Sequence, residues 1–240
     1  MNHQTQELVW QGKEEGLQAV LVAADEAIKG GDTIGAHCLR ASAYHSRYAA
    51  LIPRNIGTAF TMFRLARWHA YLAYYTMHRQ GYAGVTHGQF DVVATILLKS
   101  WLWHRPNPKL AHDLLKRGLA LSNVPPHARA LMIIGLAESR YLRRRRRECP
   151  GLIEQALLIE KDLAFEDDYD QARRQFARVL RRAGVLQYRL GSHEQALSSF
   201  ARAKTIVELG STKSADQAWK QRLSFLYMYI PNGFRWLVPT

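Results

Sequence analysis

Arginine is the residue whose type and spacing in this sequence could do chemistry. Residues 127–149 hold seven arginines against two acidic residues, and residues 168–190 hold six against two. A planar guanidinium binds carboxylate or phosphate through two parallel hydrogen bonds, and it also stacks on rings. On a helix over 169–190 the arginines cover about half of the circumference, opposite an apolar arc. The candidate anion-binding or partner-binding residues are therefore Arg140, Arg143, Arg144, Arg145, Arg146, Arg147, Arg173, Arg174, Arg178, Arg181 and Arg182.

Two other interpretations of these arginines stay open. The first is an ordinary solvated helix face, which is what most charge runs are. The second is internal neutralisation, in which the acidic residues of 166–170 fold back over residues 143–147. Such surface ion pairs are weak and are screened by salt.

No motif of an enzyme active site occurs. The phosphate-binding and dinucleotide-binding glycine patterns and the GxSxG nucleophile turn are missing, and His193-Glu194 lacks the second histidine of HExxH. Cys38 follows His37 directly, but adjacent helical residues do not face each other. His37 and His45 could share a helix face, yet their spacing of eight is not the i, i+4 spacing of a helical metal pair. We expect no catalytic residues, no metal site and no cofactor.

Aromatic residues crowd the segment 57–79, with two further tryptophans at Trp101 and Trp103. Most follow helical spacing, which favours a buried core role. The alternative is stacking of nucleic-acid bases on the rings, because arginines interleave with them. The rings are Phe60, Phe63, Trp68, Tyr71, Tyr74 and Tyr75, and the arginines are Arg64, Arg67 and Arg79.

Composition describes a basic globular chain. Its 240 residues are 48% hydrophobic and carry a formal net charge of +13. Such a charge attracts polyanions, whether nucleic acid, an anionic membrane or an acidic protein segment. Two cysteines without ligand spacing favour a reducing compartment. The N-terminus has no Sec-signal pattern and no window supplies the ~20 apolar residues of a membrane span, so we expect a cytoplasmic protein without a transmembrane segment.

Apolar residues recur at spacings of three and four residues along almost the whole sequence, which predicts an all-α fold. Gly30-Gly31 is expected to end one helix, Asp32 to cap the next, and Pro108, Pro126 and Pro150 to stand at helix entries. No linker composition divides the chain, so one domain over 1–240 is expected. The predicted helices cover 13–29, 33–51, 57–79, 89–104, 108–122, 127–147, 151–163, 169–190, 193–208 and 215–230.

A helix-turn-helix pattern of small and large residues spans 180–203. It comprises Leu180, Ala183, Gly184, Gly191, Ala196, Phe200 and Ala203. This segment resembles a tetratricopeptide repeat, although Gln187 replaces the usual aromatic residue and Glu208 the frequent closing proline. The resemblance implies antiparallel helix pairs stacked as an α-solenoid of about ten helices. It also implies that the first helix of each pair, including both arginine-rich helices, lines the concave surface.

The last segment, 214–240, is unusually apolar for a chain end. It is expected either to cap the stack or to dock a partner subunit. Together these features predict a non-enzymatic scaffold or adaptor whose basic surface binds an acidic peptide or protein segment, either alone or as a subunit of a larger complex. The alternative is a nucleic-acid-binding subunit that places the same arginines on phosphates.

Overall fold

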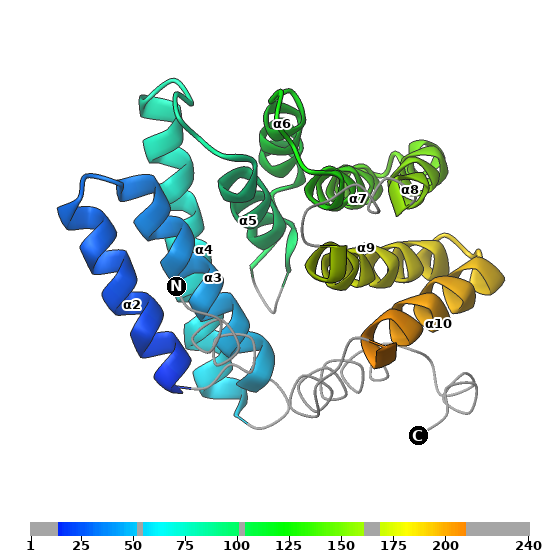
Figure 1. Ribbon diagram of the computed structural model, residues 1–240, viewed down its shortest axis with the longest axis horizontal. Coiled ribbons are helices and arrows are strands. Elements are labelled where there is room, and N and C mark those ends of the chain that lie inside the picture. Colours follow the sequence, from blue (N-terminus) through cyan, green and yellow to red (C-terminus); the bar gives the residue numbers. More distant parts are fainter. Residues whose placement is uncertain (1–13, 52–54, 101–103, 161–168, 210–240) are drawn as a thin grey trace.

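The computed structural model describes residues 14–51, 55–100, 104–160 and 169–209, with the backbone alone for 169–171, 173, 174 and 207–209. The chain is all-α, as predicted. The described residues contain no strand, and their nine α-helices and one 3₁₀ turn (η1, Arg146–Glu148) are joined mostly by short turns (Figure 1). The α-helices are α2 (Glu14–Lys29), α3 (Thr33–Leu51), α4 (Ile56–Arg79), α5 (His87–Leu98), α6 (Pro108–Leu119), α7 (Pro126–Leu142), α8 (Cys149–Leu158), α9 (Tyr169–Arg189) and α10 (His193–Leu209).

Local capping explains most helix boundaries. Gly31 has a φ of 86° after α2, and the carboxylate of Asp32 accepts a 2.7 Å hydrogen bond from the Gly35 N–H. Thr86 and Gln89 form a capping box at the start of α5. Proline stands in the first turn of α6, α7 and α8, as expected. The helix expected at 215–230, like the whole segment 214–240, lies outside the described residues.

Four predicted helices are too long by three residues or more, and those over 108–122 and 151–163 end at Leu119 and Leu158. The helix expected over 89–104 ends at Leu98, because Lys99 is extended and the Asn107 N–H bonds to the Leu97 carbonyl. The helix expected over 127–147 ends at Leu142. Five consecutive arginines would repel one another along a helix, and the backbone turns away there instead.

Each helix packs against the next along the chain, as in α2 with α3, α3 with α4, α5 with α6, and α9 with α10. A second set of contacts joins alternate helices, α3 with α5, α5 with α7, and α7 with α9. Figure 1 shows α2 to α4 side by side at one end of the molecule and α7 to α10 at the other, with α5 and α6 between them. None of the described helices has the length and apolarity to cross a membrane.

Helix α7 joins the two largest core clusters. Met132 and Leu136 belong to a cluster built with α3 to α6, whereas Ile133, Ile134 and Ala137 belong to one built with α8 to α10. Ten of its 17 residues are buried. A helix that is apolar on nearly every side is the expected sequence signature of such a central position.

Helices α9 and α10 form the close pair expected from their small residues. A Cβ on Gly184 would lie 2.7 to 2.9 Å from ring atoms of Phe200, so the two helices meet at a contact that only glycine permits. Gly191, with φ of 87°, makes the turn between them. Buried against this contact, each at most 1% exposed, are Leu180, Ala183, Ala196 and Ala203.

Candidate anion-binding surface

Residues 143–147, here called the arginine turn, connect α7 to α8. The Arg143 and Arg145 N–H groups bond to the Ser139 and Arg140 carbonyls, which closes the end of α7. Arg144 adopts a left-handed φ of 62°, and η1 follows. Arg143 is partly exposed, and Arg144 to Arg147 are all exposed. The arginine turn therefore projects its guanidinium groups from a bend and not from one face of a helix.

Glu148 is the carboxylate nearest to the arginine turn among the described contacts. Its carboxylate forms an ion pair with the Arg140 guanidinium at an N–O distance of 2.9 Å, and the Arg140 side chain is only 17% exposed. The Arg145 guanidinium lies 3.7 Å from the same carboxylate. The alternative neutralising segment was expected at 166–170, of which 166–168 lie outside the described residues and the side chain of Asp170 is not described. Glu148 offsets one positive charge of the turn, so the described part of this surface keeps a basic excess.

Tyr141 links the arginine turn to the end of α9. The guanidinium of Arg146 lies 5.2 Å from the Tyr141 ring centroid, and that of Arg189 lies 6.0 Å from it. Arg189 is not among the predicted site residues, although it contributes to the basic excess of its helix. That share of the basic excess is a sequence signal that could have added it.

Arg182 does not belong to the exposed surface, contrary to the prediction. Its side chain is 9% exposed and binds the Glu138 carboxylate of α7 through two hydrogen bonds, of 2.8 and 3.0 Å. A fork-to-fork pair of this kind satisfies both buried charges. Burial alone would raise the pKa of Glu138, but Arg182 and Lys99 outweigh it and lower that pKa to about 2. Arg182 is therefore a structural residue.

Two more charged residues, Asp91 and Lys99, interact electrostatically with this pair. Burial raises the pKa of Asp91 on α5, and the positive charges of Arg182 and Arg178 oppose that rise. Glu138 raises the pKa of Lys99, but burial and the neighbouring arginines outweigh it and lower that pKa. These partners stand far from α9 in the sequence, which is why spacing alone does not reveal them.

The remaining predicted arginines lie along α9. Arg178 and Arg181 are partly buried, and Arg178 donates a 2.8 Å hydrogen bond to Gln175. The side chains of Arg173 and Arg174 lie outside the described part of the chain. The predicted surface thus divides into the exposed arginine turn with Arg140, and a partly buried row on α9.

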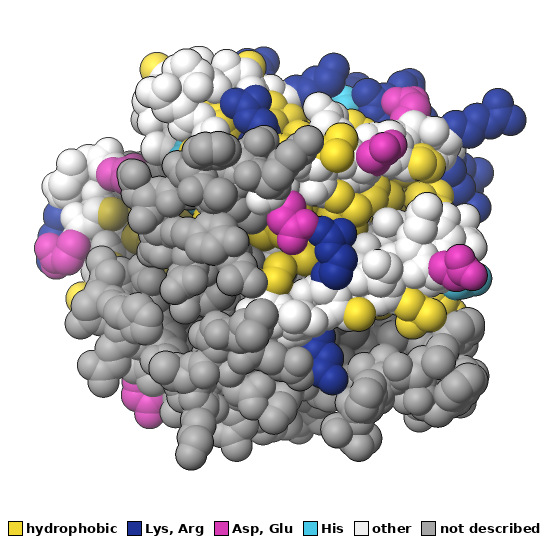
Figure 2. All heavy atoms as spheres, turned by 45° about the vertical axis from the view of Figure 1, so that its right-hand side comes forward, with side chains coloured by type: hydrophobic (Ala, Val, Ile, Leu, Met, Phe, Trp, Pro, Cys, Tyr) yellow, Lys and Arg dark blue, Asp and Glu magenta, His cyan; other side chains and the backbone are white. Residues whose placement is uncertain are grey.

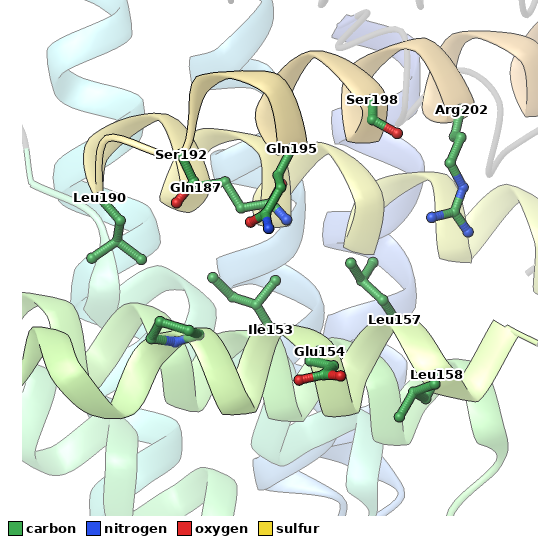
Figure 3. A pocket seen from close by; sticks show the side chains of 11 residues that line it. Ile153, Glu154, Leu157, Leu158, Gln187, Leu190, Ser192, Gln195, Ser198 and Arg202 are labelled. Carbon is green, nitrogen blue, oxygen red and sulfur yellow. The ribbon is translucent and has the colours of Figure 1, made fainter.

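An open groove of about 620 Å³ lies between α8 and α10, and its lining includes Pro150, three residues beyond the arginine turn. Its apolar side chains are Ile153, Leu157, Leu158 and Leu190, and its polar ones include Glu154, Gln195 and Arg202. Figure 3 shows Ile153 and Leu157 pointing toward α10, with Gln195 and Arg202 pointing back. In Figure 2, hydrophobic side chains cross the middle of the forward face, and Lys and Arg gather at its upper and right edges.

Other titratable groups lie outside the arginine-rich surface. No three His, Cys, Asp or Glu side chains there lie close enough to hold a metal ion. The Nδ1 atoms of His37 and His69 lie 3.2 Å apart. Burial raises the pKa of Cys38 to about 12 and also raises that of Cys149, so both thiols stay protonated at neutral pH.

The aromatic residues of α4 divide between two faces. Phe63 is fully buried, as the core interpretation predicted, whereas Trp68 is 62% and Tyr75 is 58% exposed. Arg67 is buried and donates to the Lys99 and Arg105 carbonyls, each at 3.0 Å. Trp101 and Trp103 lie outside the described residues.

No protein-family model, curated protein or solved structure matches this chain. Its function is therefore inferred from its own residues.

Proposed function

We propose that this protein is a non-enzymatic scaffold or adaptor, built as a tetratricopeptide-like α-solenoid, whose basic surface binds an acidic peptide or protein segment. Two sets of helix contacts support the solenoid. In one, α3 packs on α5, α5 on α7 and α7 on α9; in the other, each of these four helices packs on the helix that follows it in the chain. Stacked helix pairs bury a continuous core and leave long surfaces for partners.

The observation that carries the proposal is the position of the groove beside the arginine turn. Pro150 at one end of the groove follows the turn by three residues, and Leu190 of the same lining follows Arg189. Arg189 and Arg146 lie on the same Tyr141 ring, so the turn and the groove end are held together. An apolar floor and an exposed basic cluster are therefore continuous.

The partner that fits this combination is an amphipathic segment with an acidic end. Its apolar side chains would lie over Ile153, Leu157 and Leu158, as helices do in hydrophobic grooves. Its carboxylates would meet the exposed guanidinium groups of Arg144 and Arg147. Charge complementarity of this kind speeds association and fixes orientation.

The test is affinity purification from native lysate with the Arg144→Glu/Arg147→Glu variant. The matched control is Arg64→Glu/Arg79→Glu, which changes the net charge equally at exposed positions of α4. We expect nuclease-treated lysate to yield a protein partner that the first variant loses and the control keeps. Leu158→Asp, at a 55% exposed position of the groove, should also lose it. Unchanged capture by the Arg144→Glu/Arg147→Glu and Leu158→Asp variants would contradict the proposal.

The second candidate is a nucleic-acid-binding subunit that uses the same arginines on phosphates. It would be favoured if nuclease treatment abolished capture and if bound oligonucleotide were released along a steep log-log salt slope. The arginine turn supports both candidates, but the aliphatic groove beside it favours a protein segment.

A further inference from the structure

The exposed face of α4 carries aromatic rings between two arginines. Taken at about 100° per residue, five side chains fall within an arc of about 80°. We call them the α4 stripe, which comprises Arg64, Trp68, Tyr71, Tyr75 and Arg79. The buried residues of the same helix, among them Phe63, Ala66, Ala70 and Met77, centre on nearly the opposite side. The stripe is thus the outward surface of α4.

Two rings of the α4 stripe stand out from the surface, and the third, Tyr71, packs against the core cluster. Trp68 and Tyr75 are more than half exposed and lie seven residues apart, about 10 Å along the helix. Tyr71 lies between them, and its hydroxyl accepts a 3.2 Å hydrogen bond from the buried Arg67. Arg67 in turn binds the carbonyls of Lys99 and Arg105. The middle of the stripe is therefore anchored to the chain that connects α5 and α6.

Further exposed cations lie on α6 and just before it. They are Lys109, Lys116 and Arg117 on α6 and Arg105 before it, with Asp113 as the exposed acid among them. Two contacts join this row to the α4 side of the molecule. The Arg67 hydrogen bond reaches the Arg105 carbonyl, and the Arg117 guanidinium lies 4.1 Å from the ring centroid of Tyr82, three residues beyond α4.

We propose that the α4 stripe is a stacking platform for single-stranded nucleic acid. Bases would stack on Trp68 and Tyr75, while phosphates would lie against Arg64, Arg79 and the α6 cations. Alternating rings and cations suit a strand that offers a π-face and a negative charge at every nucleotide. The stripe contains no aliphatic side chain, in contrast to the α8–α10 groove, where Ile153, Leu157 and Leu158 would suit a peptide. This inference does not rest on the proposed function.

The test is fluorescence anisotropy of labelled poly-U and poly-dT oligonucleotides of about 15 nucleotides, in about 50 mM salt. We expect wild-type binding, with Trp68→Ala/Tyr75→Ala weakening it about 100-fold and leaving its salt slope unchanged. Trp68→Phe/Tyr75→Phe should keep most of the affinity, because both rings remain. Trp68→Leu/Tyr75→Leu should lose it, because aliphatic groups do not stack on bases. A difference between the two oligonucleotides would tell RNA from DNA preference.

Charge variants separate this surface from the arginine turn. Arg64→Gln/Arg79→Gln should reduce the log-log salt slope by about 1.4, the value for two phosphate contacts on a single strand. Arg144→Gln/Arg147→Gln, equal in charge change, should reduce the slope by less than this, and a larger reduction in that pair would assign the phosphates to the arginine turn and overturn the proposal. Both pairs occupy exposed positions, so folding is preserved and circular dichroism will verify it.

Several results would overturn the proposal. One is that wild type does not bind the oligonucleotides, and another is that the alanine or leucine variants bind them with full affinity. A third is that an acidic peptide displaces the oligonucleotide and itself needs the same rings to bind. Sedimentation provides one more. If wild type is a dimer and Trp68→Ala/Tyr75→Ala is a monomer, the stripe belongs to a second copy of the chain.

Discussion

Glu138 of α7 and Arg182 of α9 form a two-point ion pair in the interior, with N–O distances of 2.8 and 3.0 Å. The pair joins two helices that also share an apolar cluster. Removing one partner leaves a buried charge without its counter-ion. Arg182→Ala is expected to lower the free energy of unfolding by about 3 to 5 kcal/mol in urea denaturation.

The double variant Arg182→Met/Glu138→Leu separates charge from packing. It removes both charges and keeps apolar volume, so it should recover most of the stability lost by Arg182→Ala. If the double variant is as unstable as the single one, packing and not the uncompensated carboxylate accounts for the loss.

The glycine contact between α9 and α10 predicts a steric effect. Gly184→Ala places a Cβ within 3 Å of the Phe200 ring and should destabilise the fold by about 1 to 3 kcal/mol in thermal or urea unfolding. Gly151→Ala is the matched control, because a Cβ at that position in α8 meets nothing within 4 Å. The control should be neutral or stabilising by up to about 1 kcal/mol. Equal destabilisation by both substitutions would be inconsistent with the contact.

The pair of His37 and His69 predicts a pH effect on stability. Burial, His37 and Arg40 lower the pKa of His69 to about 4, from an ordinary value of 6.5. The unfolded chain therefore binds this proton first as the pH falls, so stability present above pH 6.5 is lost progressively toward pH 4.

His69→Phe removes this titration and retains a ring beside Tyr44, whose centroid lies 5.7 Å from that of His69. Because His69 is only half buried, solvent screens its charge. Between pH 7 and pH 4 we therefore expect the wild-type protein to lose only about 1 kcal/mol more unfolding free energy than His69→Phe loses. An NMR titration of the His69 ring gives an independent measure. A ring that titrates near 6.5 would rule out this effect.

The hydrogen bonds of Arg67 predict that lysine at this position destabilises the fold although it keeps the positive charge. Its guanidinium reaches two carbonyls and the Tyr71 hydroxyl at once, at 3.0, 3.0 and 3.2 Å. Arg67→Lys keeps the charge but cannot span three acceptors in one plane, so it should lose about 2 kcal/mol of stability in urea denaturation. Arg64→Lys, exposed on the same helix, serves as the control and should change stability by less than about 0.5 kcal/mol. Equal stability of Arg67→Lys and wild type would show that these hydrogen bonds contribute little.

Helix positions were largely predictable because their signals are local. Asp32 caps a helix that begins with the next residue, and the three helix-entry prolines act within their own first turn. The ends at Leu98 and Leu142 are harder to predict because each depends on residues beyond the helix. One is set by a loop that returns to the Leu97 carbonyl, and the other by repulsion within the arginine turn.

The candidate site was less predictable because partners distant in the sequence decide exposure. Helical spacing places Arg182 closer to the apolar arc of α9 than Arg178 or Arg181, but its interior position is evident only from its contacts with Leu131 and with Glu138, 44 residues away. The α4 rings present the same difficulty. Helical spacing places Phe63 on one face and Trp68 on another, but it does not say which face the neighbouring helices will cover.

Alkylation of the two buried cysteines can measure whether the core clusters on the two sides of α7 open together. Cys38 lies in the core cluster that α7 shares with α3 to α6, and the Cys149 thiol donates to the Ala137 carbonyl on the opposite side of α7. Alkylation of either thiol requires the structure around it to open. If α7 makes the two halves one cooperative unit, both cysteines should be modified at the same rate. Faster modification of one would identify the half that opens on its own.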